Sequence, residues 1–227
     1  MKLVCISDTH MAHGKLVIPE CDVLIHAGDW THRGTIEQIA EFAEWFRNLD
    51  QAGEKICIPG NHDIMVEKHT ERVRAEFPAE DGVHLLIGES VLIDGVSFWG
   101  DPHTPRFGLG YAFQLDRGRK AAAHWAKMPS HTNVAITHGP PIGYGDRVPD
   151  ADIAGNWSAK HPVMCNAGDA SLLARLHEVR PQYHICGHLH GGYGVHRHLD
   201  LSTVVVNAAV SADRNNQANF NPIVLHI

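Results

Sequence analysis

Short hydrophobic runs rich in β-branched residues recur along the chain and predict strands. Several are almost continuously apolar, which is typical of strands covered on both faces. The predicted strands are Leu3–Ile6, Val23–His26, Lys55–Ile58, Val83–Ile87, Val91–Ile93, Val96–Trp99, Asn133–Thr137, Tyr183–Cys186, Thr203–Asn207 and Ile223–Ile227. Three of them follow one another between Val83 and Gly100 without a helix, so we expect a hairpin and a mixed sheet.

Amphipathic patterns between the strands predict helices over Thr35–Ala52, Glu67–Phe77, Gly118–Met128 and Ala170–Arg180. The first begins with Thr35 and Gln38 at the spacing of a capping box, and Gly53 follows its end. Asp169 is placed to cap the last helix. Strands that alternate with helices predict an α/β fold in which helices cover the sheets.

The 227 residues contain no internal repeat, low-complexity tract or interdomain linker, which predicts a single domain over residues 1–227. Two stretches depart from the strand and helix pattern. Residues 101–116 are rich in proline, glycine and aromatic side chains, and residues 139–168 have little periodicity. Long loops within a compact domain often carry function, so we expect both stretches to cap a site and to choose its leaving group.

The net charge, the apolar runs and the cysteine pattern argue against several classes of protein. Lys and Arg number 19 against 26 Asp and Glu, and a net charge of −7 makes general nucleic-acid binding unattractive. No apolar run approaches the roughly 18 residues of a membrane span. The apolar stretch that ends at Asp8 is too short for a secretion signal. The five cysteines form no C-x-x-C pair, which predicts free thiols and a cytoplasmic setting.

Histidine is enriched, at 19 of 227 residues, and histidine is the commonest metal ligand. Polar residues follow five of the predicted strands at their carboxyl ends, where open α/β sheets bind ligands. The ligand candidates are Asp8, His10, Asp29, Asn61, His138, His188 and His190. Any one of them alone is most simply a turn former or a satisfied polar group. Their joint occurrence at five strand ends favours a shared site.

The donor types indicate which ions the site prefers. Imidazoles mixed with carboxylates and an amide suit Mn²⁺, Fe or Zn²⁺ better than Ca²⁺, which prefers oxygen alone. The donors are too many for one tetrahedral zinc, so we expect two metals that share one carboxylate. Such a pair keeps a local positive charge in an acidic protein, and phosphate esters are the anions that a two-metal site clamps.

The ordered motifs Asp8-x-His10, Gly28-Asp29, Gly60-Asn61-His62-Asp63, His138-Gly139 and Gly187-His188-x-His190 resemble those of the calcineurin-like metallophosphoesterase superfamily. The runs Thr137-His138-Gly139-Pro140-Pro141 and Gly187-His188-x-His190-x-Gly192-Tyr193-Gly194 are similar to the metallophosphoesterase-domain-containing subgroup of class III cyclic-nucleotide-phosphodiesterase-like enzymes. The resemblance implies two mixed β-sheets packed as a sandwich and flanked by helices, in four αββα layers.

The resemblance also assigns roles to individual residues. It implies that the first metal is held by Asp8, His10 and His190, and the second by Asn61, His138 and His188. Asp29 would bridge the two ions, and a bridging hydroxide would attack phosphorus. His62 would donate a proton to the leaving group, as a catalytic acid beside the substrate-binding Asn61.

One departure from the family pattern concerns the neighbourhood of His62. Related phosphatases often carry Gly-Asp-x-x-Asp-Arg-Gly, whose second acid supports the donor histidine and whose arginine grips phosphate. Here Arg33 stands at the matching position, but His32 replaces the acid. We expect one of two arrangements. Either another carboxylate supports His62, with Asp63 nearest in sequence, or the pKa of His62 differs from that of the donor histidine in related phosphatases. Arg33 as a surface residue remains an alternative.

Tyr193 is a candidate for lining the substrate pocket, with core packing as the alternative.

The leading function is hydrolysis of small phosphodiesters, cyclic nucleotides among them. A phosphomonoesterase or protein phosphatase is the runner-up, and a catalytically weak scaffold on the same fold is the rival from another class. Exonuclease activity fits the acidic composition less well. P-loop, dinucleotide-binding, serine-esterase and zincin motifs are absent from the sequence.

Overall fold

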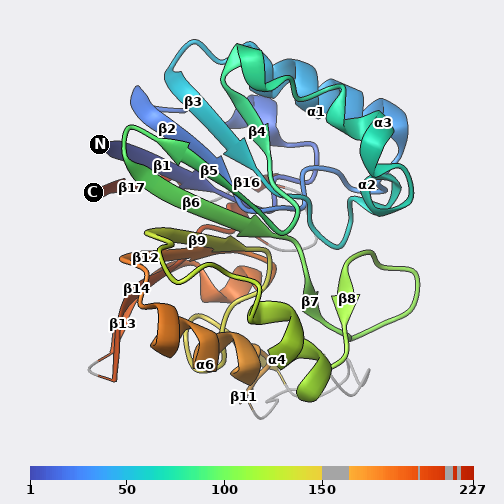
Figure 1. Cartoon of the computed structure of the whole chain (residues 1–227). Coiled ribbons are helices and arrows are strands. Elements are labelled where there is room, and N and C mark those ends of the chain that lie inside the picture. Colours follow the sequence, from blue (N-terminus) through green and yellow to red (C-terminus); the bar gives the residue numbers. More distant parts are fainter. Residues whose placement is uncertain (150–163, 199, 213–216, 219–220) are drawn as a thin grey trace.

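The computed structural model describes residues 1–149, 164–198, 200–212, 217–218 and 221–227. A five-stranded and a six-stranded sheet pack face to face and carry helices on their outer sides (Figure 1). The predicted sandwich of two mixed sheets flanked by helices is confirmed. The α/β class follows from strands that are covered on both faces.

The first sheet has the strand order β17-β1-β2-β3-β4. Its parallel strands are β1 (Lys2–Ile6), β2 (Cys21–His26), β3 (Ala52–Cys57) and β4 (Val83–Leu85), and β17 (Ile223–His226) pairs antiparallel with β1. The register sets Ile6 opposite His26 and His26 opposite Cys57. The segments that follow these three strands therefore start level with one another at one edge.

The second sheet has the order β13-β14-β12-β9-β6-β5. Its strands are β5 (Glu89–Ile93), β6 (Val96–Asp101), β9 (Val134–Thr137), β12 (Tyr183–Cys186), β13 (Gly194–His198) and β14 (Leu201–Asn207). Four of them, β6, β9, β12 and β14, run parallel. The strand block between Val83 and Gly100 divides between the sheets, because β4 joins the first while the β5–β6 hairpin joins the second.

β13 is not among the predicted strands. It is a polar edge strand that pairs antiparallel with β14 alone, so its sequence needs no apolar run.

Alternate residues of the strands face different layers of the sandwich. In β1, Leu3 and Cys5 pack into the core between the two sheets, while Val4 and Ile6 pack toward the helical side. The inner core continues through side chains of the second sheet such as Phe98. Because both faces of the strand are buried, its sequence reads as an unbroken apolar run.

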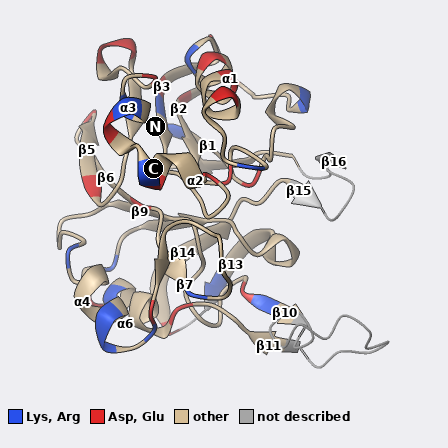
Figure 2. Cartoon of the chain, turned by 90° about the vertical axis from the view of Figure 1, so that its right-hand side faces the viewer, with Lys and Arg blue, Asp and Glu red and all other residues tan. Residues whose placement is uncertain are grey.

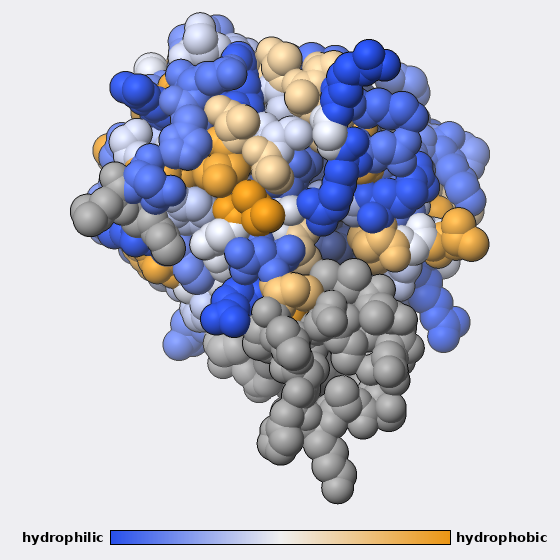
Figure 3. Space-filling model, turned by 90° about the horizontal axis from the view of Figure 1, so that it is seen from below, coloured by the Kyte–Doolittle hydropathy of each residue, from blue (hydrophilic) through white to orange (hydrophobic). Residues whose placement is uncertain are grey.

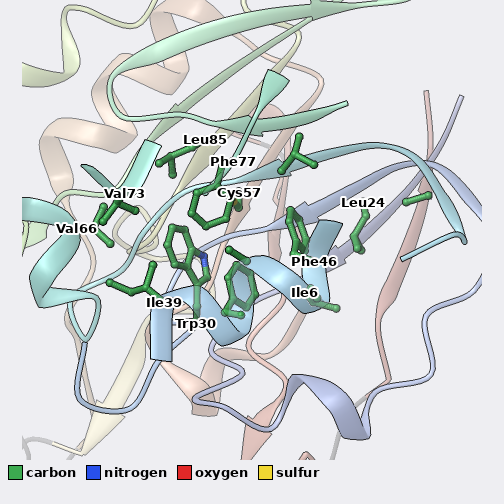
Figure 4. Packing of buried hydrophobic residues seen from close by; sticks show 14 of the residues in the cluster. Ile6, Leu24, Trp30, Ile39, Phe46, Cys57, Val66, Val73, Phe77 and Leu85 are labelled. Carbon is green, nitrogen blue, oxygen red and sulfur yellow. The ribbon is translucent and has the colours of Figure 1, made fainter. Parts of the chain in front are cut away.

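Helix α1 (Ile36–Arg47) covers the outer face of the first sheet. Figure 4 shows Ile39 and Phe46 among the buried side chains that surround Trp30. The predicted capping box is half formed, since Thr35 Oγ1 accepts from Gln38 N at 3.3 Å. The Gln38 side chain accepts instead from Arg33 N, at 2.9 Å.

Helices α4 (Arg119–Trp125) and α6 (Ala170–Val179) cover the second sheet. Asp169 caps α6 as predicted, with Oδ1 accepting from Ser171 N at 2.7 Å. Its other oxygen accepts from Trp125 Nε1 at 2.9 Å. This one carboxylate therefore joins the two helices.

The predicted helix Glu67–Phe77 is wrong as a single element. The chain forms α2 (Ile64–Lys68) and α3 (Thr70–Arg74), separated by His69 at φ −138° and ψ 44°. Thr70 Oγ1 donates to Val66 O at 2.8 Å, the carbonyl that Thr70 N–H would use in a continuous helix. The hydroxyl thus competes with the backbone at the break.

Short elements complete the described chain. They are 3₁₀ turns at His13–Lys15, Ala79–Asp81 and His190–Gly192 and the pairs β7 (Thr104–Pro105) with β8 (Gln114–Leu115), β10 (Arg147–Pro149) with β11 (Met164–Asn166), and β15 (Ser211–Ala212) with β16 (Gln217–Ala218). The β7–β8 pair lies within the candidate capping loop 101–116. Of the other candidate loop, 139–168, residues 150–163 lie outside the described residues.

All five cysteines are free thiols, as predicted. Among the described residues, each helix is too short or too polar to cross a bilayer.

His184 is buried in the second sheet as a neutral side chain. Its Nε2 lies 2.7 Å from Thr137 Oγ1, whose hydroxyl donates to Gly139 O. Because that hydroxyl proton is committed, Nε2 carries the proton of the neutral ring and donates to Thr137. Burial lowers the pKa of His184 to about 3, and burial likewise lowers the pKa of His26 to about 3.

We expect the free energy of unfolding to fall as the pH is lowered from about 6.5, the ordinary histidine pKa, toward about 3. In that window the unfolded chain takes up protons at His26 and His184, while the folded chain does not. The thermal midpoint of the chelator-treated protein should therefore decline between about pH 7 and pH 5. His184→Gln keeps a donor toward Thr137 and should flatten the decline. A midpoint that rises over this range would contradict the assignment.

Candidate metal centre

The five polar strand ends meet at one edge of the sandwich, where the two sheets adjoin. Three belong to the first sheet, after β1, β2 and β3, and two belong to the second, after β9 and β12. Ligand atoms of Asp8, His10 and His190 lie within 4.8 Å of one another, and so do those of Asp29, His138 and His188. The structure thus forms two ligand groups from residues far apart in sequence, and a ring nitrogen of His62 also lies within 4.8 Å of ligand atoms of His10 and Asp29, one residue from each group.

The first ligand group has the spacing of atoms that share an ion. His190 Nε2 lies 3.3 Å from Asp8 Oδ1 and 3.4 Å from His10 Nε2. The His10 Nε2 to Asp8 Oδ1 distance is 4.0 Å. Two donors that are each about 2.1 Å from one ion stand about 3–3.5 Å apart, so small adjustments would close the group around a metal.

The second ligand group adds the amide of Asn61. His138 Nε2 lies 3.3 Å from Asp29 Oδ2 and 3.0 Å from Asn61 Oδ1. Asp29 Oδ2 is also 3.9 Å from His10 Nε2, which belongs to the first group. Asp29 therefore stands between the two groups, at the position of a shared ligand.

Backbone carbonyls orient two of the imidazoles. His138 Nδ1 lies 2.8 Å from Ala27 O, and His10 Nδ1 lies 3.1 Å from Thr31 O. A proton on Nδ1 serves these carbonyls and leaves the lone pair of Nε2 toward the other donors, as metal-binding histidines require. The donor types and their orientation fit a pair of divalent ions.

Four of the candidate ligands have a left-handed backbone conformation. The φ angles are 56° for Asp8, 42° for His10, 56° for Asp29 and 64° for His188. This region is sparsely populated by residues other than glycine, and such outliers cluster at functional sites. The surrounding structure maintains this strain where the ligands converge.

Two motif glycines are explained by the close approach of the carboxylates. A Cβ on Gly60 would overlap Asp29 Oδ1, and a Cβ on Gly187 would overlap Asp8 Oδ2. Any side chain at either position would displace a candidate ligand. The glycines in Gly60-Asn61-His62 and Gly187-His188 are therefore steric requirements of the site.

The carboxylates and imidazoles of the site shift one another's pKa values. Burial alone would raise the carboxyl pKa values of Asp8 and Asp29, but hydrogen bonds and charge from His190 and His138 hold both well below their ordinary range. Burial opposes protonation of His138, yet the negative charge of Asp29 raises its pKa to about 9. A proton on His138 thus balances the carboxylates, and a bound cation would replace it.

The ring of His62 lies beside the first ligand group. Its centroid is 4.8 Å from that of His10, and its backbone N donates to Asp29 Oδ1 at 2.8 Å. His62 Nδ1 lies 2.9 Å from the backbone carbonyl of His32. The carbonyl fixes the ring orientation and leaves Nε2 as the nitrogen available to a substrate.

Of the two alternatives for His62, support by the Asp63 carboxylate is not what the structure has, because that carboxylate is occupied elsewhere. The Asp63 carboxylate accepts from Thr31 Oγ1 at 2.7 Å, from Thr31 N at 3.0 Å and from Gly60 N at 2.7 Å. Asp63 is fully buried, and burial together with the charge of Asp29 raises its pKa to about 6. Asp63 ties the loops that follow β2 and β3 together, and the carbonyl of His32 contacts the His62 ring instead.

The other two predicted residues have different surroundings. Arg33 is exposed, and its backbone N donates to Gln38 Oε1. Tyr193 follows the turn at His190–Gly192, and its hydroxyl donates to the carbonyl of Asn221 at 2.6 Å. Neither belongs to the two ligand groups, so their contacts with substrate remain predictions.

The group formed by Asp101, His103 and His124 has a different character. Asp101 Oδ1 lies 2.9 Å from His103 Nδ1, and Oδ2 lies 3.0 Å from His124 Nε2. These are hydrogen-bond lengths, and both carboxylate oxygens are satisfied. Although burial disfavours the charged form, these bonds hold the pKa of Asp101 at about 2. The group ties the end of β6 to α4.

A two-sheet sandwich with Asp, Asn and His donors at one edge defines a metallophosphoesterase. The sequence comparison agrees, because residues 1–192 match the family described as calcineurin-like phosphoesterase. This chain belongs to that family. The matched region contains both ligand groups, and the family makes the chain a metal-dependent phosphoesterase.

Alignments with similar proteins cover nearly the whole chain. The UPF0046 protein K07C11.7 of Caenorhabditis elegans is 34% identical over 238 residues, covering 100% of this chain and 75% of that protein. Metallophosphoesterase domain-containing protein 1 of Homo sapiens is 32% identical over 243 residues, covering 98% and 68%. The crystal structure of TT1561 of Thermus thermophilus has a TM-score of 0.61 at 10% identity, covering 92% of this chain and 88% of that one, and supports the fold alone.

Proposed function

We propose that this protein is a dinuclear metal-dependent phosphodiesterase that hydrolyses small phosphodiesters, cyclic nucleotides among them. The observation that carries the proposal is the position of Asp29 between two ligand groups. The backbone N–H of His62 donates a hydrogen bond to the same carboxylate. A shared carboxylate suits two ions rather than one.

Each part of the site has a defined task in the proposal. One ion would be held by Asp8, His10 and His190, and the other by Asn61, His138 and His188. Asp29 would bind both ions. Bound Mn, Fe or Zn ions would supply electrostatic stabilisation of the phosphoryl oxygens and a lowered pKa for water. The carbonyls of Ala27 and Thr31 orient the imidazoles before any ion arrives.

His62 is the proposed proton donor. An alkoxide is a poor leaving group, so a proton delivered from Nε2 to the departing oxygen accelerates cleavage. The carbonyl of His32 holds the opposite ring nitrogen, so the ring keeps one orientation while its proton is transferred. Because a carbonyl is neutral, it orients the ring without the negative charge that an acidic residue would add.

Space beside the second ligand group supports a diester. A cavity of about 350 Å³ opens next to His188 and is lined largely by apolar groups, including Phe107, Pro140 and Leu189. The cavity has room for an organic group on the phosphate, and in a diester it would take the second ester group while the first faces His62. Capping of the site by residues 101–116 is part of this proposal, since Phe107 lies in that segment.

Exonuclease activity is less well supported. Helix α1 carries three glutamates and a single arginine, Arg47, and the two arginines of α3 stand beside Glu71 (Figure 2). A strand of nucleic acid binds best along a continuous basic track. Small phosphate esters need no such track.

The test is hydrolysis of bis(4-nitrophenyl) phosphate by the purified protein. We expect turnover that chelation abolishes and that Mn²⁺ restores, faster than on 4-nitrophenyl phosphate or on phosphopeptides. Faster cleavage of the monoester would favour a phosphomonoesterase or protein phosphatase, with the exposed Arg33 as its phosphate-binding residue. Inactivity with every divalent metal would favour a scaffold.

A further inference from the structure

We propose that Phe107 and Tyr111, on the loop between β7 and β8, form an aromatic wall that binds a planar ring on the ester group of the substrate. The wall would make the site selective for aryl and other ring-bearing phosphate esters over alkyl ones. This inference rests on the proposed function and names the substrate class of the same site.

The two rings form a row between His188 of the second ligand group and His62. The centroid of Phe107 lies 5.1 Å from that of His188 and 4.8 Å from that of Tyr111. Tyr111 in turn lies 5.5 Å from His62. A phosphate ester bound to the ligand groups would therefore have its ester group next to these two rings.

A single glutamine fixes the shape of the loop. The Gln114 side chain accepts from Phe107 N at 3.0 Å and from Gly108 N at 3.2 Å. Its amide nitrogen donates to Gly108 O at 2.8 Å and to Tyr111 O at 3.1 Å. The backbone that carries both aromatic rings is held before any substrate binds, which limits the entropy lost on binding.

The loop is also anchored to the metal-binding segment. Ala112 N donates to the carbonyl of Asn61 at 3.0 Å, and Phe113 N donates to Glu67 Oε1 at 2.8 Å. At its root, Asp101 is held by His103 and His124, as described above. These contacts fix the wall relative to Asn61 and its neighbour His62.

The rings are nevertheless exposed, to 51% for Phe107 and 39% for Tyr111. Figure 3 shows hydrophobic residues at the right-hand side of the molecule, where the β7–β8 loop lies in Figure 1. Phe107 also lines the cavity beside His188. A rigid loop that keeps large apolar groups in water next to a polar site is typical of a binding surface, because a ring placed there removes apolar area from water.

The experiment compares two stable phosphonates that carry no cleavable ester. Calorimetry would give the affinity of the Mn²⁺-loaded protein for phenylphosphonate and for methylphosphonate. We expect phenylphosphonate to bind about tenfold more tightly, and Phe107→Ala and Tyr111→Ala each to reduce that ratio about three- to tenfold. Leu109→Ala is the matched control, since Leu109 lies on the same loop, is 96% exposed, and should leave the ratio unchanged.

The outcomes separate this inference from the proposed function. Equal affinity for the two phosphonates, or a ratio that survives both alanine substitutions, would overturn the aromatic wall even if phosphodiesters are hydrolysed. A ratio that depends on Phe107 and Tyr111 would support the wall even in a protein that hydrolyses nothing. Phe107→Leu retains apolar area without a ring face and should lose part of the ratio, and unchanged Mn²⁺ content shows that the variants are folded.

Discussion

Asp29→Asn should lower the metal content to less than about one ion per chain and reduce phosphodiester hydrolysis by at least about 10³-fold. The substitution removes the ligand that both groups share and a buried negative charge that offsets bound cations. Elemental analysis of the purified and Mn²⁺-reloaded variant measures the first effect, and initial rates measure the second.

The matched control for this prediction is Asp101→Asn. Asp101 is as buried as Asp29 and also contacts two imidazoles, but its contacts have hydrogen-bond lengths. We expect its replacement to leave the metal content at the wild-type value. Full metal occupancy in Asp29→Asn, or metal loss in Asp101→Asn, would contradict the assignment of the two groups.

His62→Asn should retain both metals and lower turnover by about 10²–10⁴ on esters with alkyl leaving groups. The loss arises because the departing alkoxide no longer receives a proton. It should shrink for 4-nitrophenolate, which leaves without protonation. Rates across a series of leaving groups, with metal content measured in parallel, test this directly.

The structure supplies a control that the sequence does not suggest. The hydrogen bond that orients His62 is accepted by the backbone carbonyl of His32, which every residue possesses, while the His32 ring lies at a centroid distance of 6.1 Å from that of His62. His32→Ala should therefore keep turnover near the wild-type value. An equal loss on all leaving groups in His62→Asn would refute the proton-donor role, and a large loss in His32→Ala would show that the imidazole at that position matters.

The α/β class could be predicted because both faces of the central strands are buried, whereas the sandwich of two sheets was implied by the family resemblance. Residues such as Val4 and Cys5 must both be apolar, so the strand is visible in the sequence. An edge strand such as β13 lacks that signal. The break at His69 is accompanied by a side-chain hydrogen bond from Thr70 to Val66 O, and neither feature changes the hydrophobic pattern.

The candidate ligands could be predicted because their residue types are chemically distinctive and follow strand ends, and the family resemblance implied their division into two groups. The contacts that orient them could not be predicted from residue types. The carbonyls of Ala27, Thr31 and His32 belong to the backbone and leave no trace in residue identity. The same limit left the partner of His62 open, since adjacency in sequence to His62 does not place the Asp63 carboxylate beside the ring.

The aromatic wall lies in a segment that the sequence marks only in general terms. Residues 101–116 are unusual in their proline, glycine and aromatic content, and Phe107 and Tyr111 are among those aromatics. Spacing alone does not show that Gln114 holds the backbone of both residues in place. Phe107 and Tyr111 differ from core residues because they are exposed next to a polar site, which the sequence does not reveal.

Anomalous diffraction from crystals loaded with Mn²⁺ tests the central claim most directly. We predict two strong peaks about 3.5–4 Å apart, with Asp29 in contact with both. One peak should lie among Asp8, His10 and His190, and the other among Asn61, His138 and His188. A single peak, or manganese bound only at Asp101, His103 and His124, would contradict the account.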